Sequence, residues 1–287
     1  MLGLTAEAER HESLFEEVRA AFNDAYVTPS GRIVGNTQTT YLLALAFDLL
    51  PEAKRAAAAE ALVALITDRR GLGGTFPPNH LATGFLGVGH LLPVLTATGN
   101  EDLAYRLLEN ETYPSWGYSI AQGATTIWER WDGWTEEGGF QNAGMNSFNH
   151  YSLGSVGEWL FSTVAGIATE PEDVGFRRLV IRPTPGGSIT WARAEHECIR
   201  GRVSVAWELT DTEMRVEVVV PTNTTAEVWL PGLSASSLTE GGRPAADVDT
   251  LELLGEVEGR TGVRVGGGTY AFVGGRTVTS AQLGGST

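Results

Sequence analysis

The spacing of apolar residues changes once along the chain, and this change constrains the fold most. Up to about residue 166, apolar residues recur every three or four positions, which predicts helices. After Pro171 they recur every second position, as Val203, Val205 and Trp207 do, which predicts strands. We therefore expect an α plus β protein in two domains, with a helical domain at 1–170 and an antiparallel β-sandwich at 171–287.

The breaks in each pattern place the individual elements. Helices are predicted at residues 5–26, 37–49, 52–69, 82–98, 101–110 and 152–168. Turn residues predict one β-hairpin at Asp211 and Thr212, a second at Pro221 to Thr225, and a third across the glycines between Val265 and Tyr270.

Charge and cysteine content exclude several kinds of protein. The 20 basic and 35 acidic residues leave a net charge of -15, which repels phosphate backbones and anionic lipid, so we expect neither nucleic acid nor a membrane as a partner. The single cysteine, Cys198, cannot form an intramolecular disulfide. The first residues also lack the basic and apolar regions of a signal peptide. The expected location is therefore cytoplasmic.

An aromatic run from Tyr113 to Trp134 carries the clearest chemical signal. It contains four of the eight tryptophans, together with two acids, Glu129 and Asp132. Aromatic ring faces cover the apolar faces of a sugar, while a carboxylate handles protons near the anomeric carbon. The run therefore predicts a glycosidase site.

Glu129 is the first candidate within this run. Its bulky neighbours would limit access of water, and the adjacent Arg130 would favour its charged form. The alternative is that Glu129 pairs with Arg130 or another base for a purely structural reason, since ion-pair networks resemble active sites. Asp132 is a weaker candidate, because Asp followed by Gly is also ordinary turn chemistry.

His150 is the second candidate, because Asn146 and Asn149 beside it could also bind sugar hydroxyls. The alternative is a structural histidine with its hydrogen bonds satisfied. His80 and His90 are ten residues apart with no third ligand nearby, so we predict no metal site and no cofactor.

Several longer strings carry a family resemblance. They are NTQTTYLLALAFDLLP at 36–51, HLATGFLGVGHLLPVL at 80–95, GATTIWERWDGW at 123–134, NSFNHYSLGSVGEWL at 146–160 and FRRLVIRPTPGG at 176–187. Through these strings the chain resembles bacterial α-L-rhamnosidases of glycoside hydrolase family 78 over nearly its whole length.

The resemblance implies a fold and a mechanism. The helical domain would be part of an (α/α)6 toroid, and the reaction would be an inverting hydrolysis that releases terminal α-L-rhamnose from rhamnosides. Glu129 matches the family's general base, and His150 matches a rhamnose-binding histidine. Trp128, Trp131 and Trp134 match by position and are predicted to be substrate-binding residues.

One family feature is missing from the sequence. The family's general acid belongs to an acidic segment, Asp-Glu-Arg followed by a tryptophan, and no such segment occurs here. We therefore expect a fragment, the C-terminal half of the catalytic domain plus the sandwich, that is inactive alone. We also expect it to self-associate or to bind a complementing N-terminal half.

Two other functions remain open at this point. The chain could be a non-catalytic carbohydrate-binding or scaffolding protein derived from such an enzyme. It could also be an inverting hydrolase of another toroid family that acts on a different sugar.

Overall fold

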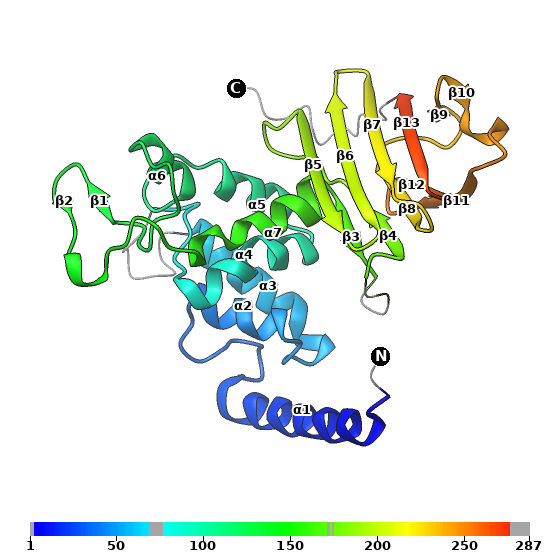
Figure 1. Cartoon of the computed structure of the whole chain (residues 1–287). Coiled ribbons are helices and arrows are strands. Elements are labelled where there is room, and N and C mark those ends of the chain that lie inside the picture. The colour runs from blue at the N-terminus through cyan, green and yellow to red at the C-terminus, as the bar shows by residue number, and fades with distance from the viewer. Residues whose placement is uncertain (1–2, 69–76, 171–172, 174, 276–287) are drawn as a thin grey trace. The chain divides into compact units, whose positions relative to one another are not determined.

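The computed structural model describes residues 3–68, 77–170, 173 and 175–275. The chain divides into two compact units, Met1–Val156 and Gly157–Thr287 (Figure 1). This division lies earlier than the boundary predicted after residue 170. Residues just after Val156 join the second unit because the helical turn at Leu160–Val164 contacts β3 (Ile167–Thr169), which pairs with β4 (Arg178–Ile181). The Val164 carbonyl also accepts a hydrogen bond from Trp207.

The first unit is mainly helical. Its helices are α1 (Thr5–Tyr26), α2 (Gln38–Ala46), α3 (Glu52–Thr67), α4 (Phe85–Ala97), α5 (Glu101–Leu108) and α6 (Trp116–Ala121). The first five begin within three residues of the predicted starts, and α6 was not predicted. None of the helices in the described part of the chain is both long and apolar enough to cross a bilayer.

Helix α2 is central to the core of the helical unit. It contacts both α3 and α4, and its Tyr41 and Leu42 are fully buried. The helix begins at a capping box, in which the Thr37 hydroxyl accepts a hydrogen bond from the Thr40 backbone N–H. The apolar residues on nearly every side of this helix are therefore explained by neighbours on several sides.

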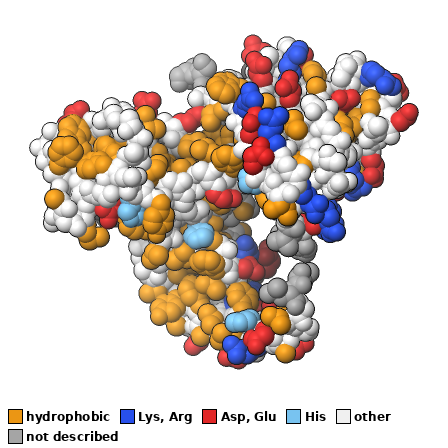
Figure 2. Space-filling view, in the orientation of Figure 1, with side chains coloured by type: hydrophobic (Ala, Val, Ile, Leu, Met, Phe, Trp, Pro, Cys, Tyr) orange, Lys and Arg blue, Asp and Glu red, His pale blue; other side chains and the backbone are white. Residues whose placement is uncertain are grey.

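Helix α1 has no buried residue, in contrast to α2. Asn23 attaches it to the segment just before α3, donating from Nδ2 to the Leu49 carbonyl at 2.6 Å. Leu14, Val18 and Tyr26 on α1 are exposed. Figure 2 shows hydrophobic side chains gathered over the helical unit and more charged side chains over the strands.

The helix predicted at 152–168 is confirmed in part, because the chain is helical from Ser152 to Val164 but is not one regular α-helix and ends four residues early. Short helical turns at Ser152–Ser155, α7 (Val156–Trp159) and Leu160–Val164 follow one another, and β3 begins three residues later. Gly166 ends the helical stretch with a φ of +81°. A Cβ at this position would collide with the backbone of Pro183, so only glycine fits the turn into β3.

The described part of the second unit contains two sheets. The six-stranded sheet has the order β10-β9-β13-β7-β6-β5, and the five-stranded sheet has the order β11-β12-β8-β4-β3. The bounds not yet given are β5 (Trp191–Cys198), β6 (Gly201–Leu209), β7 (Glu213–Val220), β8 (Thr225–Pro231), β9 (Thr239–Glu240), β10 (Arg243–Pro244), β11 (Glu252–Val257), β12 (Arg260–Val265) and β13 (Gly268–Gly275).

The hairpin predicted at Asp211 and Thr212 is confirmed, because β6 and β7 pair antiparallel on either side of it. The other two hairpins were wrong, since β7 and β8 lie in different sheets, as do β12 and β13. The predicted purely antiparallel arrangement was also wrong at one place, where β4 pairs with β8 in parallel. A short polar turn can join strands of one sheet or of two, and an alternating pattern does not distinguish the two cases.

The inner faces of the two sheets form the core of the second unit. Val203, Val205 and Trp207 alternate inward on β6 and are buried. Leu233 links the sheets, because its carbonyl accepts a hydrogen bond from Thr261 of β12 at 2.5 Å while its side chain packs beside Gly274 of β13.

Candidate active site

Two segments of the helical unit run side by side and carry the two predicted polar residues. The backbone N–H of Glu129 donates to the Ser147 carbonyl, and that of His150 donates to the Ile127 carbonyl, each at 2.8 Å. The Thr126 hydroxyl also donates to the Phe148 carbonyl. Glu129 and His150, 21 positions apart in the sequence, therefore lie on paired segments.

The Glu129 carboxylate is held by the opposite segment. Its Oε2 accepts a hydrogen bond from the Ser147 backbone N–H at 2.7 Å. This charge-assisted bond, together with the backbone bond between the same two residues, orients the side chain. The half-buried carboxylate is thus positioned by main-chain groups.

Arg130 forms its ion pair with Asp132 and not with Glu129, so the pairing of these two neighbours is not found. Its guanidinium donates from Nε and Nη2 to the two carboxylate oxygens of Asp132, at 2.8 and 2.9 Å. These hydrogen bonds lower the pKa of Asp132 below its usual value and raise that of Arg130. The pKa of Tyr113 is raised, mainly because the side chain is partly buried and to a smaller extent because the negative charge of Asp132 is nearby. Asp132 thus closes a local turn with Arg130.

His150 lies in an aromatic stack. Its ring is 4.8 Å from the Phe85 ring and 5.0 Å from the Tyr151 ring, with interplanar angles of 13° and 14°. Its Nδ1 accepts a hydrogen bond from the Ser152 backbone N–H at 3.3 Å. In the neutral ring this bond assigns the proton to Nε2, which can then donate to a ligand oxygen.

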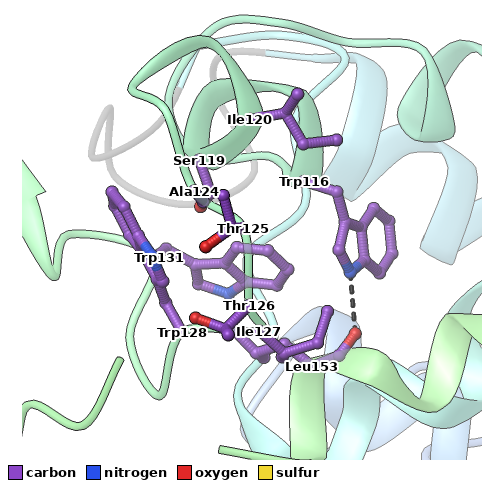
Figure 3. A pocket seen from close by; sticks show the side chains of 10 residues that line it. All are labelled: Trp116, Ser119, Ile120, Ala124, Thr125, Thr126, Ile127, Trp128, Trp131 and Leu153. Atoms are coloured by element: carbon purple, nitrogen blue, oxygen red, sulfur yellow. Dashed lines mark hydrogen bonds between the residues drawn. The ribbon is translucent and has the colours of Figure 1, made fainter. Parts of the chain in front are cut away.

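An apolar cavity of about 310 Å³ lies beside this segment (Figure 3). Trp128 and Trp131 line it, whereas Trp134 lies on β1 (Trp134–Thr135), which pairs with β2 (Gly139–Phe140). The ten lining residues are Trp116, Ser119, Ile120, Ala124, Thr125, Thr126, Ile127, Trp128, Trp131 and Leu153. Glu129 and His150 are not among them, so the cavity and the polar pair are neighbouring features and not one pocket.

Hydrogen bonds hold two of the three tryptophans that line this cavity. Trp116 Nε1 donates to the Leu153 carbonyl, drawn as a dashed line in Figure 3, and Trp131 Nε1 donates to the Thr83 carbonyl, both at 2.8 Å. The rings of Trp116 and Trp131 meet edge to face at 5.4 Å. Trp116 was not among the predicted site residues, although it belongs to the same aromatic run.

The arrangement supports one kind of chemistry. A fixed carboxylate at Glu129 can accept a proton from water, and the Nε2 of His150 can bind a hydroxyl. Within the described ranges, no group of three or more His, Cys, Asp and Glu side chains could hold a metal ion.

Two protein-family models match the chain and identify its class of protein. Residues 1–164 match the bacterial α-L-rhamnosidase six-hairpin glycosidase domain, and residues 166–244 match the bacterial α-L-rhamnosidase C-terminal domain. Both descriptions name parts of one class of protein, the glycoside hydrolases. The chain belongs to the bacterial α-L-rhamnosidase family.

Individual relatives agree with this assignment. The chain is 50% identical over 228 residues to an α-L-rhamnosidase of Streptomyces avermitilis, covering 79% of this chain and 21% of the relative. An α-L-rhamnosidase of Formosa agariphila is 41% identical over 274 residues, 95% of this chain and 28% of the relative. The chain therefore spans about a quarter of the length of these relatives.

Solved structures show the same relationship. The structure of a Streptomyces avermitilis α-L-rhamnosidase complexed with L-rhamnose matches with a TM-score of 0.83 at 44% identity, over 93% of this chain and 24% of that one. The native Aspergillus terreus α-L-rhamnosidase matches with a TM-score of 0.80 at 30% identity, over 97% and 28%.

Proposed function

We propose that this chain contributes the general base and a sugar-binding histidine to an inverting α-L-rhamnosidase. The main support for this proposal is that the segments of Glu129 and His150 pair through backbone hydrogen bonds. The Glu129 carboxylate is also held by the Ser147 N–H at 2.7 Å. Glu129 accepts a proton from the attacking water, and His150 donates from Nε2 to a hydroxyl of the rhamnose ring.

The inverting mechanism requires a second carboxyl group. Inverting glycosidases place the two groups roughly 6.5 to 9.5 Å apart, with the water on one side of the sugar and the protonated leaving oxygen on the other. The family's acidic segment is not among these 287 residues. We infer that the acid comes from a portion of polypeptide outside them, within the same barrel-shaped (α/α)6 toroid.

The exposed apolar residues of α1 fit the same proposal. Leu14, Val18 and Tyr26 are solvent-exposed on a helix that has no buried residue. Contact with a complementing helical portion, or with a second copy of the chain, would cover them.

Complementation tests the proposal. This chain alone should hydrolyse an aryl α-L-rhamnoside at least about 10²-fold more slowly than a fusion to the preceding portion of the Streptomyces avermitilis relative, because acid catalysis typically contributes about 10²- to 10⁴-fold. Product release should be followed by NMR so that the anomer formed first is seen. Rapid turnover by the chain alone would contradict the need for an outside acid. Sugar binding without turnover in a folded fusion would instead favour a non-catalytic binding protein.

Replacing His150 with alanine should raise KM in the fusion about tenfold, with a smaller change in kcat. The change removes one hydrogen bond to a sugar hydroxyl, and tenfold corresponds to about 1.4 kcal/mol. His90→Ala is the matched control, because His90 is also half-buried and packs edge-on against Phe47 at 5.1 Å. Equal KM changes in the two variants would rule out a specific sugar contact by His150.

A further inference from the structure

The outward face of the six-stranded sheet carries a second cavity, of about 410 Å³, centred on β5, β6 and β7. Its volume lies in the range of small-molecule sites, roughly 300 to 1,000 Å³. The three strands are neighbours in the sheet (Figure 1). The lining residues are Trp191, Ala192, Arg193, Ala206, Trp207, Glu208, Arg215 and Glu217.

Trp191 forms an exposed aromatic wall of this cavity. It is 68% exposed at the start of β5, whereas Trp207 on the neighbouring strand is 2% exposed. One exposed apolar side chain is ordinary on a protein surface. Trp191 differs because its ring borders a hollow and is paired across the strands with a carboxylate, Glu208.

The register of the strands explains the hollow. Ala206 lies between Arg193 on one side and Glu217 on the other. The small alanine side chain leaves a depression between longer neighbours, and Trp191 and Glu208 form the adjacent row on the same face, since side chains two positions apart share a face.

The polar groups around the depression can hold hydroxyls. The carboxylate oxygens of Glu208 and Glu217 border the depression and can accept hydrogen bonds from a ligand. Arg193 donates from Nη2 to Glu195 at 2.8 Å and has further N–H donors. An aromatic face beside carboxylates and a guanidinium is the combination that recognises a sugar ring, whose faces are apolar and whose edge carries hydroxyls.

We propose that this face is a second carbohydrate-binding site, in which Trp191 stacks on a pyranose ring of a glycan while Glu208, Glu217 and Arg193 bind its hydroxyls. A protein partner fits the surface less well, because the centre of a protein interface is depleted in charged residues and this hollow is bordered by four of them. The site binds the glycan and does not act on it, so it is independent of Glu129.

The side-chain N–H signal of Trp191 gives a readout specific to this site. The whole chain, labelled with ¹⁵N, is titrated with methyl α-L-rhamnopyranoside and, separately, with methyl α-D-glucopyranoside. The Trp191 signal is identified by its loss in Trp191→Phe. We expect it to shift saturably with at least one glycoside, with a Kd on the order of 1 mM. The same shift is expected in Glu129→Gln, so failure of the proposed hydrolase would not affect this result.

Ala206→Gln fills the depression but keeps the Trp191 side chain, so its N–H signal can still be followed. This variant should bind the glycoside at least about fivefold more weakly. Ile199→Ala is the matched control, because Ile199 is another exposed apolar residue, in the turn between β5 and β6, and does not line the cavity. It should leave the shift unchanged. The proposal is overturned if neither glycoside gives a saturable shift, if Ala206→Gln binds as well as the parent chain, or if the signal moves with protein concentration alone, which would place a second copy on this face.

Discussion

Replacing Glu129 with glutamine is expected to lower kcat/KM of the complemented enzyme for an aryl α-L-rhamnoside by about 10³-fold or more. Loss of a general acid or base typically costs about 10²- to 10⁴-fold. Glutamine has the same shape, and its amide oxygen can still accept from the Ser147 N–H that holds the carboxylate at 2.7 Å. The loss should therefore come from proton transfer, with little change in the fold or in KM. Steady-state kinetics on the fusion described above measures it.

Two further variants separate this role from a general loss of charge. Glu129→Ala should be rescued by azide, which can replace the activated water and yield the rhamnosyl azide of inverted anomeric configuration. Asp132→Asn should keep activity within about tenfold, because Asp132 is bonded to Arg130. If Asp132→Asn lost most of its activity while Glu129→Gln kept near-normal activity, Asp132 and not Glu129 would be the general base. Rescue that yields the retained anomer would contradict inversion.

Replacing Trp207 with alanine should lower the free energy of unfolding of the sheet unit by about 3 to 5 kcal/mol, the usual range for truncating a buried tryptophan. Its side chain is 2% exposed and faces the core between the sheets. Its Nε1 donates to the Val164 carbonyl at 2.7 Å, so the change also leaves that carbonyl without its partner. Urea unfolding followed by far-ultraviolet circular dichroism measures the effect.

The neighbouring strand offers a matched control. Trp191→Ala removes the same side chain from a site that is 68% exposed, and it should change the free energy of unfolding by no more than about 0.5 kcal/mol. Trp207→Phe keeps most of the buried ring area and should cost less than Trp207→Ala. Equal losses in Trp191→Ala and Trp207→Ala would contradict the inward orientation of Trp207.

The local patterns predicted much of the fold because they depend on neighbours in the sequence. Helix α1 begins and ends where its pattern predicts, and β6 and β7 form the predicted hairpin. The aromatic run is also a local pattern, and its composition is enough to indicate Glu129 as a candidate. What the pattern could not show was which strands pair, because an alternating strand looks the same whichever sheet it joins.

The candidate site shows the same division. The sequence placed a cation beside Glu129, but Arg130 bonds to Asp132 instead. The sequence predicted that three tryptophans, Trp128, Trp131 and Trp134, serve the site together. Of these three, Trp128 and Trp131 line the cavity, while Trp134 lies on a short strand. Adjacent residues often point in different directions, so their partners are decided by what packs against each side chain.

The sequence alone determined the two kinds of secondary structure and the family, because periodicity and ordered strings are properties of the chain itself. Only the tertiary structure decided that the segments of Glu129 and His150 pair, that β4 joins β8 in parallel, and that Trp191 faces outward beside a hollow. These features depend on contacts between residues distant in the sequence. Such contacts form only when the whole unit excludes water and satisfies its backbone hydrogen bonds together.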